Sequence, residues 1–263
     1  MNRIELDISL WKEGEKSWEE LYPIFQNAVN SERKKSFLFI VNKVKESQEL
    51  YAFLKKNNPG AKKIYLSAAI LPEKRKHLIK IIKEHSSSDS CEQLLVVATQ
   101  VVEAGVDIDF DIVYRDFAPI DCINQSAGRC NRNGIKGLGQ VRLFASTKGS
   151  SNVYDGTLMN ISKRVLVQQT MKGLDNIIPE SAFFDLNERY ACEIYKGIAE
   201  ESDHSKLIGS MKHLQFADVA KNFKLIDSNL NRYSVFIDCD NQSHEIWSAI
   251  CLSILIRVFG IYL

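Results

Sequence analysis

The amino-acid sequence predicts an α/β protein in which a parallel sheet is flanked by helices and followed by a mostly helical extension. Five short apolar runs, near residues 37, 64, 95, 112 and 142, have the composition of buried strands. Segments with helical periodicity separate most of these runs, and this alternation is typical of a parallel sheet with helices on both faces. After about residue 150 the pattern becomes helical, apart from two strand-like runs at 223–227 and 233–238.

The expected elements follow one another in a regular order. A strand near residues 4–8 precedes a helix that carries Trp18 and Val29, and the run SFLFIV at 36–41 leads into a helix that begins at Asn42. The remaining strands are expected at 63–66, 94–98, 112–114 and 140–145, and the remaining helices at 72–84, from Pro119 onwards, and at 153–170, 180–201 and 205–222. We therefore expect an α/β domain over residues 1–150 and, over residues 151–263, a helical extension with a short β-hairpin.

Composition and charge exclude several classes of protein. A hydrophobic fraction of 45% and a charged fraction of 25% are ordinary for a globular chain, which excludes wholesale disorder. Net charge is only +1, but residues 31–85 hold 14 Lys or Arg against 5 Asp or Glu. This basic segment favours a phosphate backbone as partner, although lysine-rich helices also arise for solubility alone.

Cysteine and histidine usage predicts no metal site. The six cysteines form no Cys-x-x-Cys pair, and the five histidines are dispersed. With no secretory signal and an apolar C-terminal run interrupted by Ser248, Ser253 and Arg257, we expect a cytoplasmic protein with no membrane partner.

Polar residues follow several of the predicted strands at their carboxyl ends, where ligands bind in parallel sheets. Ser67 and Thr99 stand at two such ends, and Arg75 lies on the helix after Ser67. Hydroxyl groups and backbone N–H groups at such positions hold phosphates without reading base sequence. These three residues are candidates for nucleic-acid binding, and structural capping is the alternative interpretation.

The expected helix after Pro119 places Gln125, Arg129 and Arg132 at i, i+4 and i+7 on one face. Gly128 removes bulk between them, so that a ligand can approach the backbone. Two arginines aimed together suit a polyphosphate, because each guanidinium offers forked donors and permanent charge. A solvated helical stripe, or structural salt bridges, are the alternatives.

Two sequence motifs carry a resemblance to a known family. The pattern A-T-x-x-x-E-x-G-x-D at 98–107, followed by Q-x-x-G-R-x-x-R at 125–132, resembles the fifth and sixth motifs of superfamily 2 helicases. Within that superfamily, VVEAGVDIDFD at 101–111 and INQSAGRCNRNG at 123–134 are similar to the CRISPR-associated helicase-nuclease of type I systems. The segment LQFADVAKNFKLIDSNLNRYSVFID at 214–238 resembles the same family.

The resemblance implies a RecA-like, P-loop NTPase-like fold, with this chain as the second of two such domains. It implies that Arg132 is an arginine finger and Arg129 a second phosphate contact, both catalytic. Gln125, Gly128, Gly105 and Asp107 would bind ATP. Single-stranded DNA would lie along Thr99, Ser67 and Arg75.

The sequence contains no G-x-x-x-x-G-K-[ST] loop and no Asp-Glu-x-His motif for magnesium. We therefore expect ATP with Mg²⁺ to be held mainly by a first RecA-like domain, and the isolated chain to be inactive. The implied partners are single-stranded DNA, the first RecA-like domain, the nuclease domain and a CRISPR surveillance complex. The alternatives are a non-catalytic binding or interaction module and a superfamily 2 helicase outside the CRISPR group.

Overall fold

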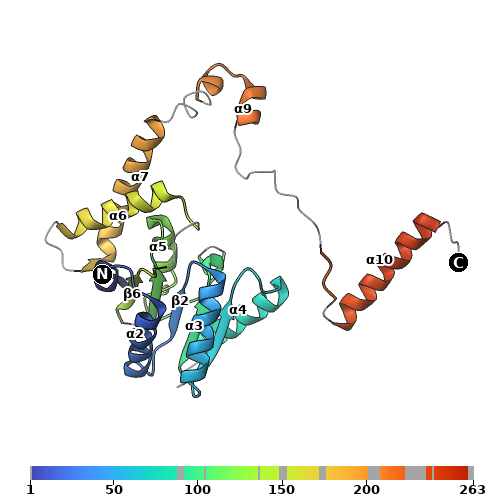
Figure 1. Cartoon of the computed structure of the whole chain (residues 1–263), viewed down its shortest axis with the longest axis horizontal. Coiled ribbons are helices and arrows are strands. Elements are labelled where there is room, and N and C mark those ends of the chain that lie inside the picture. The colour runs from blue at the N-terminus through green and yellow to red at the C-terminus, as the bar shows by residue number, and fades with distance from the viewer. Residues whose placement is uncertain are drawn as a thin grey trace. The chain divides into compact units, whose positions relative to one another are not determined.

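The chain forms two compact units, Met1–Glu201 and Ser202–Leu263 (Figure 1). The computed structural model describes residues 2–87, 92–103, 105–135, 137–147, 153–171, 176–200, 208–222, 235–238 and 240–259.

The first unit is built on a seven-stranded sheet with the order β3-β4-β2-β5-β6-β1-β7. All neighbouring strands run parallel except β7, which pairs antiparallel with β1. The strands are β1 (Ile4–Asp7), β2 (Phe37–Ile40), β3 (Lys62–Leu66), β4 (Leu94–Ala98), β5 (Ile112–Asp116), β6 (Gly139–Phe144) and β7 (Ile177–Pro179). The predicted mostly parallel α/β sheet is confirmed.

Helices cover both faces of this sheet. They are α1 (Ser9–Lys12), α2 (Trp18–Ser31), α3 (Val44–Asn57), α4 (Pro72–Ser87), α5 (Ile120–Ala127), α6 (Gly156–Met171) and α7 (Phe183–Glu200), with 3-10 turns η1 (Gln100–Val102) and η2 (Glu180–Ala182). A capping box starts α2. The Ser17 hydroxyl accepts a hydrogen bond from the backbone N–H of Glu20, and the Glu20 carboxylate accepts one from the backbone N–H of Ser17, so two N–H groups at the helix start have partners.

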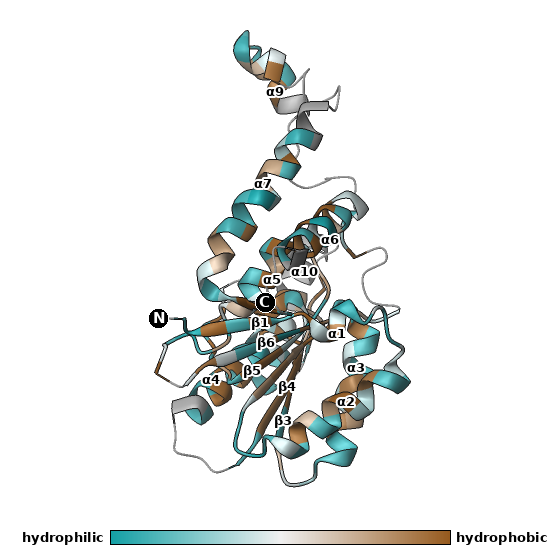
Figure 2. Cartoon of the chain, turned by 90° about the vertical axis from the view of Figure 1, so that its left-hand side faces the viewer, coloured by the Kyte–Doolittle hydropathy of each residue, from teal (hydrophilic) through white to brown (hydrophobic). Residues whose placement is uncertain are grey.

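Two apolar cores lie on opposite faces of the sheet. One joins α2 and α3 to alternate residues of the central strands, with Phe25, Phe37, Phe39 and Tyr114 in ring contact. The other joins α4, α5, α6 and α7 to the remaining strand residues. The strands are therefore apolar on both sides, and Figure 2 shows them mostly in the brown of hydrophobic residues.

The first unit extends beyond the domain boundary expected at residue 150. Val165 and Leu166 of α6 and Leu186 of α7 are buried in the same core as the sheet, so both helices belong to the α/β unit. The apolar faces of α6 and α7 need this core, because a lone helix pair buries too little surface to stabilise itself.

The second unit is helical where the structure describes it. Residues 208–212 are helical, followed by α9 (Phe216–Asn222) and α10 (Asn241–Phe259). Almost all of the expected β-hairpin lies outside the described residues, and the described part, 235–238, is not assigned to a strand. Among the described helices, none combines the length and the hydropathy that a membrane crossing requires.

One polar network interrupts the apolar interior. Arg115 of β5 is fully buried, and its guanidinium donates to the Asn42 Oδ1 at 2.6 Å and to the Tyr154 hydroxyl at 2.8 Å. The same guanidinium forms an ion pair with Glu103 at 2.8 Å. Burial nevertheless raises the pKa of Glu103, because the loss of hydration outweighs the attraction of Arg115.

Asp116 extends this network at the end of β5. Its carboxylate accepts hydrogen bonds from the backbone N–H of Asn42 at 3.4 Å and from that of Ser146 at 3.2 Å. Burial raises the pKa of Asp116 to about 7, despite the neighbouring Arg115. Three strand ends, those of β2, β5 and β6, are thereby joined through one carboxyl group.

The glycine that opens β6 gives a first prediction. A Cβ atom at Gly139 would lie 2.8 Å from both the Asn131 Cβ and the Cys130 Sγ, whereas a Cβ at Gly137 would meet nothing within 4 Å. We expect Gly139→Ala to lower the free energy of unfolding by about 1–3 kcal/mol, since these contacts cannot relax without moving backbone. Urea denaturation measures this, with Gly137→Ala as the matched control. Equal stability of the two variants would contradict the close packing.

Asp116 gives a second prediction, on pH. Its pKa rises from 3.8 to about 7 on folding, so between these values the folded state binds a proton that the unfolded state has lost. The contribution of this group to stability is therefore largest at low pH and decreases as pH rises towards 7. We expect Asp116→Asn to reduce the loss of stability between pH 5 and pH 7.5, measured by urea denaturation at both pH values.

Asp155 provides the control for this measurement. Its pKa is lowered by hydrogen bonds from the backbone of Leu158 and Thr157, so it stays ionised across the whole window. Asp155→Asn should change stability equally at pH 5 and pH 7.5. A wild-type pH dependence that persists unchanged in Asp116→Asn would show that Asp116 is ionised in the folded protein.

Candidate functional site

Three strand ends meet at the carboxyl edge of the sheet. The backbone N–H of Thr99, after β4, donates to the carbonyl of Leu66 at 3.0 Å, and that of Val41, after β2, donates to the carbonyl of Ala98 at 2.9 Å. Ser67, after β3, is fully buried, and its hydroxyl has no hydrogen-bond partner among the described residues. Thr99 is also buried and makes no side-chain cap on η1. Neither hydroxyl therefore serves as a helix cap.

The loop after β4 carries the first of the two motifs. Beyond η1 it passes through Glu103, which is buried, and then Gly105, which has φ +70° and is exposed. A side chain would be strained at this φ, so glycine is required for the loop to turn outward. Asp107 follows on the surface. The loop therefore leaves the buried network, reaches solvent at Gly105 and Asp107, and is buried again from Ile108 to Phe110.

The second motif does not form the continuous helix that its spacing predicted. α5 ends at Ala127, and Gly128 is its C-terminal cap. Residues 129–132 instead form turns, with Asn131 at φ +41°. Backbone hydrogen bonds that join Arg129 and Asn131 to Phe110 stabilise this shape. The expectation that Gln125, Arg129 and Arg132 share one helical face was wrong, because these bonds replace the helical ones.

The three long side chains consequently have different environments. Gln125 is exposed on α5. Arg129 is buried, and its guanidinium donates to the carbonyl oxygens of Val102 at 2.9 Å and of Glu103 at 2.6 Å. Burial lowers the pKa of Arg129, and the positive charge of Arg132 lowers it further by a smaller amount. Arg129 thus joins the second motif to the loop of the first motif.

Arg132 is the arginine that reaches solvent, with 42% of its side chain exposed. Its Nε lies 3.3 Å from the Asp107 Oδ1, and the other oxygen of Asp107 accepts from the Lys83 Nζ at 3.1 Å. The backbone N–H of Arg132 donates to the Asp109 Oδ1 at 2.8 Å. Lys83, which has the larger effect, and Arg132 together hold the pKa of Asp107 below its usual value. An ionised carboxylate therefore lies between two cations from different elements.

A groove of about 520 Å³ runs beside this ion-paired cluster. Its walls are α4 and the loop after β4, and its lining residues are Pro72, Arg75, Lys76, Ile79, Lys83, Val101, Gly105, Val106 and Asp107. The groove brings together Arg75, Gly105 and Asp107 from the sequence-based candidates. Ser67, Thr99, Gln125, Gly128, Arg129 and Arg132 do not line it.

Sequence reasoning missed Lys76 and Lys83. The spacing in the sequence could have indicated Lys83, since Arg75, Ile79 and Lys83 lie at i, i+4 and i+8 and so share a face of α4. The proximity of Lys83 to Asp107 was not available, because it depends on how the loop folds.

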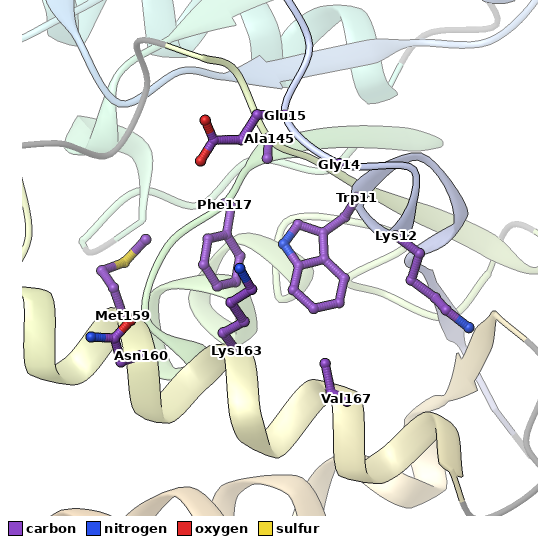
Figure 3. Close-up of a pocket in the computed structure, with 10 residues that line it drawn as sticks. All are labelled: Trp11, Lys12, Gly14, Glu15, Phe117, Ala145, Met159, Asn160, Lys163 and Val167. Atoms are coloured by element: carbon purple, nitrogen blue, oxygen red, sulfur yellow. The ribbon is translucent and has the colours of Figure 1, made fainter.

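A second hollow, of about 450 Å³, lies between α1 and α6 (Figure 3). Trp11 and Phe117 form its apolar floor, with ring centroids 5.4 Å apart, and Lys163 reaches over it. It contains none of the residues that the motifs singled out. In the part of the chain that the structure describes, no cluster of three or more His, Cys, Asp or Glu residues could hold a metal ion.

Comparison with known proteins identifies relatives over most of the chain. Residues 33–135 match the family model described as CRISPR-associated nuclease/helicase Cas3, C-terminal. The Cas3 nuclease/helicase of Methanothermobacter thermautotrophicus is 29% identical over 216 residues, which cover 79% of this chain and 25% of that protein. That of Haloferax volcanii is 43% identical over 68 residues, which cover 26% of this chain and 7% of that protein. The chain thus spans a quarter or less of these relatives.

Solved structures share the fold. The crystal structure of T. fusca Cas3 with AMPPNP aligns with a TM-score of 0.59 at 18% identity, covering 86% of this chain and 28% of that one. A structure titled CRISPR RNA-guided surveillance complex, pre-nicking, aligns with a TM-score of 0.55 at 18% identity, covering 84% and 28%. The family match, the relatives and the shared fold agree: over most of its length the chain is similar to the C-terminal helicase domain of Cas3 proteins, and it shares their fold.

Proposed function

We propose that this chain is the second RecA-like half of an ATP-dependent helicase that acts on single-stranded DNA in CRISPR antiviral defence. The observation that carries the proposal is the exposed Arg132, which the fold brings within 3.3 Å of Asp107 from the other motif. In this proposal Arg132 is the arginine finger, and a first RecA-like domain supplies the Walker loop and holds most of the ATP and its Mg²⁺.

The environment of Arg132 supports this role. An ion pair between exposed side chains contributes little stability, about 0–1 kcal/mol, so Arg132 can exchange Asp107 for a phosphate at small cost. A phosphoryl group in transit offers more charge than one carboxylate, and an arginine aimed at it stabilises the transition state. Gly105 and Asp107 would face the same nucleotide, because they flank the groove beside Arg132.

Arg129 has a different role in this proposal. Two of its donors already bind the carbonyl groups of Val102 and Glu103. We assign it to positioning the loop that carries Gly105 and Asp107, rather than to direct contact with phosphate. Gln125 and Gly128 would contact the nucleotide only after the first RecA-like domain closes over α5.

The DNA track in this proposal begins at the carboxyl edge, at Ser67 and Thr99, and continues to Arg75. Support comes from the buried hydroxyl of Ser67, which has no hydrogen-bond partner among the described residues, and from the basic α4 helix that follows it. Contacts of this kind hold a backbone without reading bases, so affinity should fall steeply as salt rises. The nuclease domain and the surveillance complex complete the proposed set of partners.

ATPase assays test the proposal. We expect the chain alone to be inactive, and to become active with single-stranded DNA when a first RecA-like domain is added. Arg132→Ala should then lower turnover by about 10³-fold or more, because the variant loses the guanidinium that stabilises the charge developing in the transition state. Arg132→Lys should retain only part of the wild-type turnover, since a lysine ammonium lacks the forked donor geometry of a guanidinium.

Arg164→Ala is the matched control, because Arg164 is also exposed and ion-paired, with Glu193 at 3.3 Å, but lies on α6. Full activity of Arg132→Ala in the paired system would refute the arginine-finger assignment. DNA binding without any ATPase activity in the pair would favour a non-catalytic binding module. Activity stimulated by RNA alone would favour a superfamily 2 helicase outside the CRISPR group.

A further inference from the structure

The groove beside Asp107 has one basic wall. Arg75 and Lys83 lie on the same face of α4, eight residues apart, and Lys76 is next to Arg75. A rise of 1.5 Å per residue separates the two ends of this wall by roughly 12 Å. The opposite wall is formed by the loop after β4, where Gly105 has no side chain and so leaves room for a ligand.

The charges in this groove are unbalanced. Arg75, Lys76 and Lys83 contribute three cations, while Asp107 is the only carboxylate among the described lining residues. Arg75 and Lys76 make no ion pair with any carboxylate of the described chain. Asp107 is also paired with Arg132, outside the groove. An anion in this groove would therefore meet a net positive wall.

Asp107 already occupies the position of such an anion. Its Oδ2 accepts from the Lys83 Nζ at 3.1 Å, and Lys83 is the largest cause of the lowered pKa of Asp107. The carboxylate is therefore ionised and stabilised by the lysine that a ligand would use. A phosphate oxygen, which offers the same charge and acceptor geometry, can replace it.

We propose that the groove between α4 and the loop after β4 is a phosphate-binding site in which Lys76 and Lys83 join Arg75, and in which Asp107 competes with the phosphate for Lys83. The inference rests on the proposed function and extends it to residues outside the two motifs. The phosphate belongs either to a nucleic-acid backbone or to a nucleotide, because both present the same oxyanion.

Fluorescence anisotropy of the full chain with labelled oligo-dT, across a salt series, tests the site. Lys83→Met and Lys76→Met should each weaken binding by about 3- to 10-fold at low salt and reduce the magnitude of the salt slope by about 0.7. Asp107→Asn should strengthen binding by a similar factor, because it removes the carboxylate charge that competes with the phosphate for Lys83. All three side chains are exposed, so the thermal midpoint should stay close to that of the wild type.

Lys80→Met is the matched control. Lys80 has the same charge on the same helix, but it does not line the groove and lies 3.8 Å from Glu84. It should bind DNA like the wild type. A loss in Lys80→Met equal to that in Lys83→Met would reduce the effect to overall helix charge and overturn the site.

A second arm distinguishes the two sources of phosphate. Inorganic tripolyphosphate and a fluorescent ATP analogue are titrated against the same variants. If the substitutions weaken DNA binding and leave nucleotide binding unchanged, the groove binds the nucleic-acid backbone. If they weaken nucleotide binding and leave DNA binding unchanged, the groove binds the nucleotide. DNA binding and nucleotide binding that none of the three substitutions alters would together overturn the inference and leave the proposed function intact. A wild-type chain that binds neither DNA nor nucleotide would also overturn the inference, whereas the proposed function is decided by the ATPase assay of the paired domains.

Discussion

The rest of this structure depends on the burial of the Arg115 guanidinium in the interior of the α/β unit. A buried charge needs acceptors for its donors, and the terminal nitrogens of Arg115 find them in Asn42, Glu103 and Tyr154, while its Nε has no hydrogen-bond partner among the described residues. These partners come from the segment after β2, the loop after β4 and the segment before α6. One side chain therefore fixes three connections at the carboxyl side of the sheet, two of them beside the predicted DNA-binding edge.

The candidate site is built outward from this anchor. Glu103 is held by its side chain to Arg115 and by its carbonyl to Arg129, so the start of the loop is rigid on two sides. The loop is exposed at Gly105 and Asp107, and Asp107 and Arg132 meet there in an ion pair that solvent weakens. The buried hydrogen bonds and ion pair of Glu103 position the site. The exposed ion pair between Asp107 and Arg132 can exchange one partner for a phosphate, which suits a site that binds and releases ligands during turnover.

Sequence reasoning predicted the fold because buried parallel strands are apolar on both faces. It ended the β5 strand at Tyr114, whereas the strand continues through Arg115 and Asp116 because the buried network supplies hydrogen-bond partners to both side chains. The roles of the two motif arginines could not be read from spacing, because Arg129 and Arg132 lie beyond the end of α5. Lys83 was missed because its proximity to Asp107 is a tertiary contact.

A double-mutant cycle on Arg115 and Glu103 tests the central claim, that this buried pair anchors the loop of the site, most directly. The free energy of unfolding would be measured by urea denaturation for Arg115→Met, Glu103→Gln and the double variant. We expect Arg115→Met alone to lower it by about 3–5 kcal/mol, because Glu103 is left buried without its cationic partner, and the double variant to lose clearly less than the sum of the single losses. Strictly additive losses would contradict the claim.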